Sequence, residues 1–82
     1  MRLDKYLKVS RLVKRRTVAN ELCDAKHVLV NYKVARASYE VKEGDIIEIH
    51  MGNRILKAKV RTVSEYATKE TAGDLYELLS DS

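Results

Sequence analysis

The spacing of apolar residues changes once along this sequence, near residue 26, and the change limits the folds open to it. Before that point Leu3 and Leu7, and then Val18 and Leu22, recur four residues apart, as they do on one face of a helix. After it, β-branched and aliphatic residues form short runs such as Val28–Val30, which is typical of strands. Helices followed by strands predict an α+β fold. The 82 residues have room for one domain, which buries only about 60% of the surface that the unfolded chain exposes.

The expected elements follow from these periods and from the residues at their ends. Asp4 and Thr17 can cap helices, because their side-chain oxygens accept hydrogen bonds from first-turn amides. Asn31-Tyr32 predicts a tight turn, and Gly52-Asn53 suits a type II′ hairpin turn. We therefore expect helices at 4–9 and 17–26, strands at 28–30, 33–35, 46–51 and 54–63, and a short C-terminal helix from residue 73 or 74 to 79.

Basic residues are concentrated at the start of the chain. Overall, 16 Lys and Arg face 12 Asp and Glu, a net charge of +4. Residues 1–16 hold seven bases and one acid and carry +6, whereas residues 62–82 hold one base and five acids and carry −4. Such a one-sign field favours binding to a phosphate backbone or an anionic membrane, and the absence of Trp and Phe disfavours the membrane. The alternative is a solvated face that serves solubility, although such faces normally mix signs.

The side chains of this segment suit a nucleic-acid backbone. Arg forms paired hydrogen bonds to phosphate, Lys adds point charge, and Thr17 and Asn20 add neutral donors. Asp4, the single acid, has two roles that can coexist. It can cap the first helix, or it can form a salt bridge with Arg2 or Arg16 and so aim that guanidinium at RNA.

A second basic row is expected on the strand at 54–63. Lys57, Lys59 and Arg61 alternate with apolar residues and therefore share one side of that strand. The row is either an exposed face or charged edge that prevents strand addition, or a further contact with RNA. The sequence leaves these alternatives open.

Residues that could carry catalysis or hold a metal are sparse. Cys23 has no Cys or His partners at ligand spacing and is interpreted as a small core or boundary residue, and His27 and His50 stand alone. Asp45, after Gly44, is interpreted as a turn-forming carboxylate. No glycine-rich phosphate loop is present. We therefore expect no enzyme activity, no metal and no cofactor, and a single cysteine with a charged amino-terminal segment predicts a protein of the reducing cytosol.

Several short pieces of the sequence, in this order, carry a family resemblance. They are Arg2-Leu3-Asp4-Lys5, Arg15-Arg16-Thr17 with Ala19 and Leu22, Val28 to Asn31, and Val41 with Gly44-Asp45-Ile46. Together they resemble the RNA-binding domain named after small-subunit ribosomal protein four, over roughly residues 1–50. The resemblance implies an αL-type RNA-binding motif, in which two helices pack on a small antiparallel sheet and the helix face with its loop binds structured RNA. The RNA-binding domain, with its β-hairpin, would occupy residues 1–63, and residues 64–82 would form an acidic C-terminal appendage.

The layout of the whole chain is most similar to the stand-alone heat-shock-fifteen type of this family and to its short relative in ribosome quality control. That resemblance implies a factor that binds the large ribosomal subunit carrying an obstructed peptidyl-tRNA and contacts ribosomal RNA and tRNA. It would hold the P-site tRNA while partner factors, including a nascent-chain elongation factor, add an alanine tail to the stalled chain. We expect a monomer that binds no membrane. The alternatives are an RNA-binding accessory subunit of an rRNA- or tRNA-modifying enzyme and, less favoured because the turn glycine is missing, a DNA-binding helix pair.

The expected RNA-binding residues combine the basic segment with the first turn between strands. They are Arg2, Asp4 as organiser, Lys5, Lys8, Arg11, Lys14, Arg15, Arg16, Thr17, Asn20, Asn31 and Lys33. The sequence departs from the family at Asn31-Tyr32, where Asn-Gly is usual. Because Tyr is strained at positive φ, a shifted turn register is one alternative, and an exposed Tyr32 that stacks on a base is another.

Overall fold

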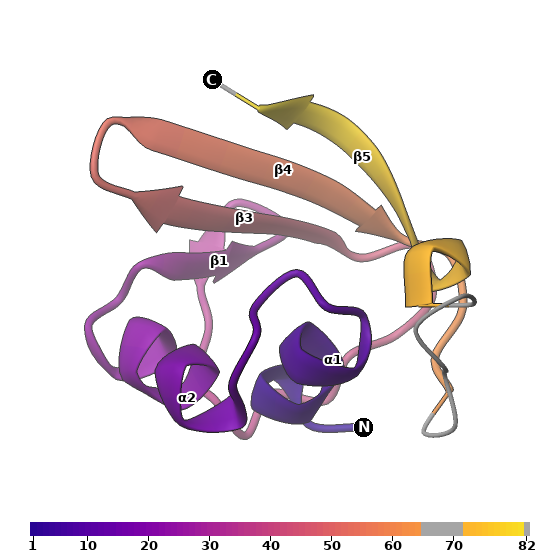
Figure 1. Ribbon diagram of the computed structural model, residues 1–82, viewed down its shortest axis with the longest axis horizontal. Helices are drawn as coiled ribbons and strands as arrows, with labels where there is room; N and C mark the ends of the chain where they lie inside the picture. Colours follow the sequence, from indigo (N-terminus) through magenta and orange to yellow (C-terminus); the bar gives the residue numbers. More distant parts are fainter. Residues whose placement is uncertain (65–71, 82) are drawn as a thin grey trace.

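The computed structural model describes residues 1–64 and 72–81. Within these residues, five antiparallel strands form one sheet in the order β2-β1-β3-β4-β5, and two α-helices lie on the same side of it (Figure 1). This arrangement confirms the expected α+β class. In chain order the elements are α1 (Leu3–Val9), α2 (Arg16–Asp24), β1 (Val28–Val30), β2 (Lys33–Val34), β3 (Ile46–Met51), β4 (Arg54–Val60), the 3-10 helix η1 (Ala72–Leu75) and β5 (Tyr76–Asp81).

The core lies between the two helices and the face of the sheet turned toward them. Tyr6 and Leu7 of α1 are fully buried, and Ile47 and Ile49 of β3 are at most 1% exposed. Burial of one such side chain stabilises the fold by about 1.5–3 kcal/mol. The described ranges contain no helix with both the length and the apolar content needed to cross a bilayer.

Neither helix begins with a side-chain cap, so the expected capping roles are wrong. Arg2 and Arg15, both with extended backbones, hold the N-cap positions of α1 and α2. Asp4 and Thr17 lie two positions deeper than expected, inside the first turns. The N-terminal amides of α1 are therefore satisfied in another way.

A distant loop supplies the acceptors that a cap would have given to α1. The amides of Leu3 and Asp4 donate to the carbonyl oxygens of Tyr39 and Ala37, at 2.8 and 3.2 Å. These bonds tie residues 37–39 to the start of α1, and they leave the Asp4 carboxylate free for other partners.

Each α-helix is followed, two residues after its end, by a basic residue whose backbone has a left-handed φ. After α2, Lys26 has φ 64°, and its amide donates to the Cys23 carbonyl at 3.0 Å while the His27 amide donates to the Leu22 carbonyl at 2.9 Å. This pair of bonds is a Schellman motif, in which glycine is the usual residue at the left-handed position. It ends α2 at Asp24, before the expected end at residue 26. Arg11, just past α1, has the same φ of 64°.

The turn between β1 and β2 keeps the register that Asn-Gly would give, which excludes the shifted alternative. Asn31 and Tyr32 have φ values of 52° and 68°, as in a type I′ turn, and Val30 pairs with Lys33 across it. The expected β3–β4 hairpin is also confirmed, because Gly52 has φ 60° in a two-residue loop.

The C-terminal segment begins with a short helix, as expected, but continues as a strand. Residues 76–79, expected to be helical, belong instead to β5, which pairs with β4. The reason is that β4 would otherwise present unpaired amides and carbonyls at the sheet edge. The Leu75 carbonyl anchors the junction, since it accepts a 2.6 Å hydrogen bond from the Tyr6 hydroxyl. β4 ends at Val60 rather than at residue 63. Residues 65–71 and 82 of the predicted appendage lie outside the described residues.

Candidate nucleic-acid interface

A buried carboxylate, that of Asp4, joins the two helices. Its side chain is 3% exposed. It binds Arg2 Nε (3.3 Å to Oδ1), the Lys5 amide (2.8 Å to Oδ1), Arg16 Nε (3.4 Å to Oδ2) and Asn20 Nδ2 (3.3 Å to Oδ2). The second role expected of Asp4, salt bridges to arginine, is therefore confirmed for both Arg2 and Arg16.

The electrostatics of this cluster favour an ionised Asp4. Burial alone would raise the pKa of the carboxyl, but hydrogen bonds from Asn20, Arg16 and the Lys5 amide, with the charge of Arg16, outweigh it and hold the pKa below its usual value. The Arg2 and Arg16 side chains remain 51% and 49% exposed. Because each guanidinium has five donor hydrogens, both retain donors for a ligand. Asp4 thus positions two guanidinium groups without covering them.

The other bases of residues 1–16 lie on α1 or in the segment that joins it to α2. Lys8, Arg11 and Lys14 line one hollow beyond the end of α1. Arg15, the next residue in the sequence, is exposed to solvent. Thr17 helps to line a second hollow together with the Asp4 cluster. The following predicted residues therefore lie on α1, α2 and the segments that flank and join them, here called the basic face: Arg2, Asp4, Lys5, Lys8, Arg11, Lys14, Arg15, Arg16, Thr17 and Asn20.

Asn31 and Lys33, the two remaining predicted residues, lie at the β1–β2 turn and not in the Asp4 cluster. The Asn31 amide group donates to Asp45 Oδ1 at 3.1 Å, so this side chain already serves the turn. Asp45 also accepts a 2.9 Å hydrogen bond from the Lys42 amide, which confirms its interpretation as a turn-forming carboxylate. Lys33 is exposed and remains a candidate for RNA contact.

The second basic row lies away from the basic face. Ala58 and Val60 are buried toward the helices, so Lys57 and Lys59 point to the opposite side of the sheet. The Lys57 ammonium lies 5.1 Å from the centre of the Tyr32 ring, a cation–π distance. Since β5 pairs with β4, the row does not lie on an open edge of the sheet. The charged-edge alternative is therefore excluded.

Cys23 is a core residue, as its isolation in the sequence predicted. It is 4% exposed, and burial together with the charges of Asp4 and Asp24 raises the pKa of its thiol to about 11. The thiol is therefore protonated and unreactive at neutral pH. Across residues 1–64 and 72–81, no cluster of three or more His, Cys, Asp or Glu could hold a metal ion.

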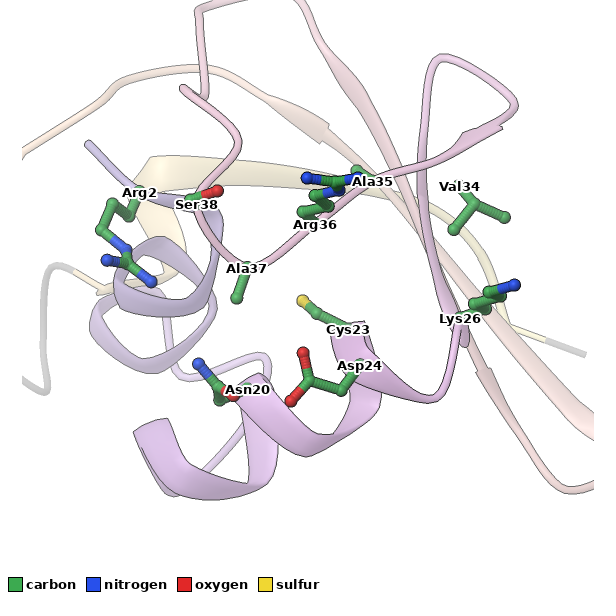
Figure 2. Close-up of a pocket in the computed structure, with 10 residues that line it drawn as sticks. All are labelled: Arg2, Asn20, Cys23, Asp24, Lys26, Val34, Ala35, Arg36, Ala37 and Ser38. Atoms are coloured by element: carbon green, nitrogen blue, oxygen red, sulfur yellow. The ribbon is translucent and has the colours of Figure 1, made fainter.

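Sequence reasoning missed two cations that line the same cavity as Arg2. Lys26 and Arg36 line a cavity with Arg2, between α2 and the loop after β2 (Figure 2). In the sequence both lie outside the basic segment. Lys26 and Arg36 line one cavity because the loop that follows β2 lies beside α2 in the folded chain.

The fold and the basic face define the class of this protein, and comparison agrees with them: the chain belongs to the S4 domain family, whose sequence model matches residues 1–47. That range contains both helices and the first two strands. The expected family is thereby confirmed.

Similarity over the whole chain narrows the class. The chain is 46% identical, over its full length and 93% of the relative, to the RQC P-site tRNA stabilizing factor of Streptococcus pneumoniae. Proteins of the same name from Halalkalibacterium halodurans and Bacillus subtilis are 49% and 41% identical, over 95% and 99% of this chain and 89% and 94% of theirs. Among solved structures, trimeric heat shock protein 15 of Vibrio cholerae matches with a TM-score of 0.89 at 26% identity, covering 98% of this chain and 82% of that one.

Proposed function

We propose that this chain is a non-enzymatic, cytoplasmic RNA-binding factor that binds the large ribosomal subunit and stabilises a P-site tRNA during ribosome quality control. The observation that carries the proposal is the Asp4 cluster, in which one buried carboxylate holds two half-exposed guanidinium groups on a face of further cations. The name shared by relatives that match almost the whole chain supports the same role.

The mechanism we propose is positional. Arginine pairs two donors with one phosphate, and its affinity for a folded RNA depends on where the guanidinium is held. Asp4 fixes Arg2 and Arg16 before RNA arrives, so less side-chain entropy is lost on binding. The remaining cations of the basic face add a field that attracts phosphate.

The finer parts of the proposal concern the particle and the partners. The bound particle is a free large subunit that carries an obstructed peptidyl-tRNA, and the chain contacts both ribosomal RNA and the tRNA as a monomer. By holding the tRNA, it allows a nascent-chain elongation factor on the same subunit to add an alanine tail. No side chain of this protein takes part in that chemistry.

Co-sedimentation of the full chain with purified large subunits tests the binding surface. Arg16→Ala should abolish co-sedimentation while circular dichroism stays unchanged, and Arg16→Lys should restore only part of it, because the ammonium lacks the paired donors. Lys42→Ala, which removes an exposed cation that is not part of the basic face, is the matched control and should bind as the wild type does. Unchanged binding by Arg16→Ala would overturn the proposed surface.

Capture of the tagged protein from cells tests the particle. Free large subunits with peptidyl-tRNA are the expected cargo. Small subunits or intact ribosomes would contradict the quality-control role, and recovery of an RNA-modifying enzyme in place of subunits would favour the accessory role instead.

A further inference from the structure

A cavity of about 470 Å³ opens between α2 and the loop that follows β2. This volume lies in the range of small-ligand sites, about 300–1,000 Å³. Figure 2 shows side chains from α2 on one side of the cavity and from residues 34–38 on the other. Of the residues that line this cavity, the proposed function uses only Arg2 and Asn20.

The base of the cavity is small and apolar. Cys23 on one wall and Ala35 and Ala37 on the other are 4%, 7% and 6% exposed, so their side chains already pack into the core. The loop wall is held in place, because the Ala35 amide donates to the Val28 carbonyl at 3.0 Å and the Ala37 carbonyl accepts from the Asp4 amide at 3.2 Å. The cavity is therefore preformed, with a surface on which a flat ring can lie.

Cations surround this apolar surface. Arg2, Lys26 and Arg36 all line the cavity. Within residues 1–64 and 72–81, the Lys26 and Arg36 side chains have no hydrogen-bond or ion-pair partner, and Arg2 shares only part of its guanidinium with Asp4. Lys26 occupies the left-handed position that ends α2, where glycine fits with less strain, and so brings an ammonium to the cavity. The cations favour an anionic ligand.

Polar groups on α2 add directional recognition. Asp24 and Asn20 of α2 both line the cavity, and the Asn20 amide group donates to Asp4 Oδ2 at 3.3 Å (Figure 2). Asp24 is exposed and has no partner among the described residues, so both of its oxygens can accept hydrogen bonds. Guanine presents two adjacent donors, its ring N–H and its amino group, to one carboxylate, whereas the other three RNA bases do not.

We propose that this cavity binds one unpaired guanine nucleotide of an RNA strand. The base lies on Cys23, Ala35 and Ala37 with its donors on Asp24, and its phosphates face the three cations. Arg2 and Asn20 belong both to the cavity and to the Asp4 cluster, so a strand bound at the basic face can continue into the cavity. The inference rests on the proposed RNA-binding function and adds a base preference to it.

The test compares hexameric oligouridylates that carry a single central G, A or C with the all-U strand, by fluorescence anisotropy on the full chain. The wild type should bind the G-containing strand about tenfold more tightly than the others, as a paired contact to one base edge allows. Asp24→Asn should remove this preference, and its affinity for the all-U strand should rise slightly, because one acid is lost beside the three cations. Equal affinity of the wild type for all strands would overturn the proposal.

A second variant separates binding from folding. Lys26→Gly removes the ammonium and relieves the left-handed strain, so it should unfold at a higher temperature and yet bind every strand several-fold more weakly. Unchanged affinity in Lys26→Gly would count against the cavity. The Lys42→Ala protein again serves as the matched loss of one charge.

Free GMP tests whether the cavity binds a guanine within an RNA strand or a free nucleotide. In amide NMR spectra, the G-containing hexamer should shift the signals of Cys23, Ala35 and Ala37, and GMP should do so only at much higher concentration. Equal potency of GMP would assign the cavity to a free nucleotide and overturn the RNA assignment. The two claims can fail separately. If the wild type shows no base preference but Asp24→Asn and Lys26→Gly still co-sediment with large subunits, the cavity inference fails and the proposed function stands. If Arg16→Ala also co-sediments, the proposed function itself fails.

Discussion

Substitution of Asp4 by Asn is the sharpest test of how the basic face works. The change keeps the size of the side chain and one carbonyl oxygen, which can still accept from the Lys5 amide. It replaces the oxygen that binds Asn20 and Arg16 with an amide group that is itself a donor. Arg2 loses its negative partner as well.

The cost to stability can be estimated contact by contact. The two arginine side chains are half exposed, so each ion pair contributes at most about 1 kcal/mol. The Asn20 hydrogen bond contributes about 1 kcal/mol, and placing two donors face to face at a buried position adds about 1 kcal/mol or more. The free energy of unfolding should therefore fall by about 3 kcal/mol, which lowers Tm by roughly 12–24 °C in a domain of this size.

The pH dependence has a defined sign. Because the pKa of Asp4 is lowered in the folded state, its contribution to stability is present above the ordinary value of 3.8 and is lost as pH falls through the lowered pKa. Urea unfolding followed by circular dichroism should show that Asp4→Asn destabilises most at pH 7 and progressively less as the pH falls through the lowered pKa of Asp4. Asp24→Asn, the same chemical change at an exposed position, should alter stability little at either pH.

RNA affinity separates positioning from simple charge. Removal of one acid from a face of cations should strengthen RNA binding if only net charge matters. If Asp4 positions the guanidinium groups, Asp4→Asn should bind large subunits at least tenfold more weakly, although the protein is more basic. Glu43→Gln, which removes an exposed acid elsewhere, measures the pure charge effect. Tighter binding by Asp4→Asn, or an unfolding free energy within about 0.5 kcal/mol of the wild type, would refute this reasoning.

Four further predictions concern single features. Tyr6→Phe should lower the unfolding free energy by only about 1 kcal/mol in urea titrations, because the Leu75 carbonyl keeps its bonds from two backbone amides. Arg11→Gly should raise the unfolding free energy by about 1 kcal/mol, since φ is 64° there, and yet weaken RNA binding in filter assays. If about six phosphates are neutralised, log affinity should fall against log salt with a slope of roughly −4 to −5, and a flat response would exclude phosphate binding. Cys23, whose thiol pKa is raised to about 11, should react with thiol reagents at pH 8 far more slowly in the folded protein than in the same protein unfolded in urea.

The order and kind of most elements could be read from the sequence, because they depend on local chemistry. The change from helical to extended spacing near residue 26 predicted helices before strands, and glycine at residue 52 predicted the hairpin turn. The charge block also predicted the basic face, since the seven bases on and between the two short helices cannot all be buried. These features need no knowledge of distant residues.

The tertiary structure decided what depends on residues far apart in the chain. Asp is a residue type that often caps helices. In this fold, however, the carbonyls of residues 37 and 39 accept the hydrogen bonds of the first amides of α1, and the Asp4 carboxylate forms ion pairs with two arginines. Residues 76–79 have spacing compatible with a helix, but they form a strand because β4 offers an unpaired edge. The cavity beside Lys26 and Arg36 likewise exists only once the chain returns past α2. Periodicity records the local preference of a segment, whereas hydrogen bonds and charges from distant segments choose among the conformations which that preference allows.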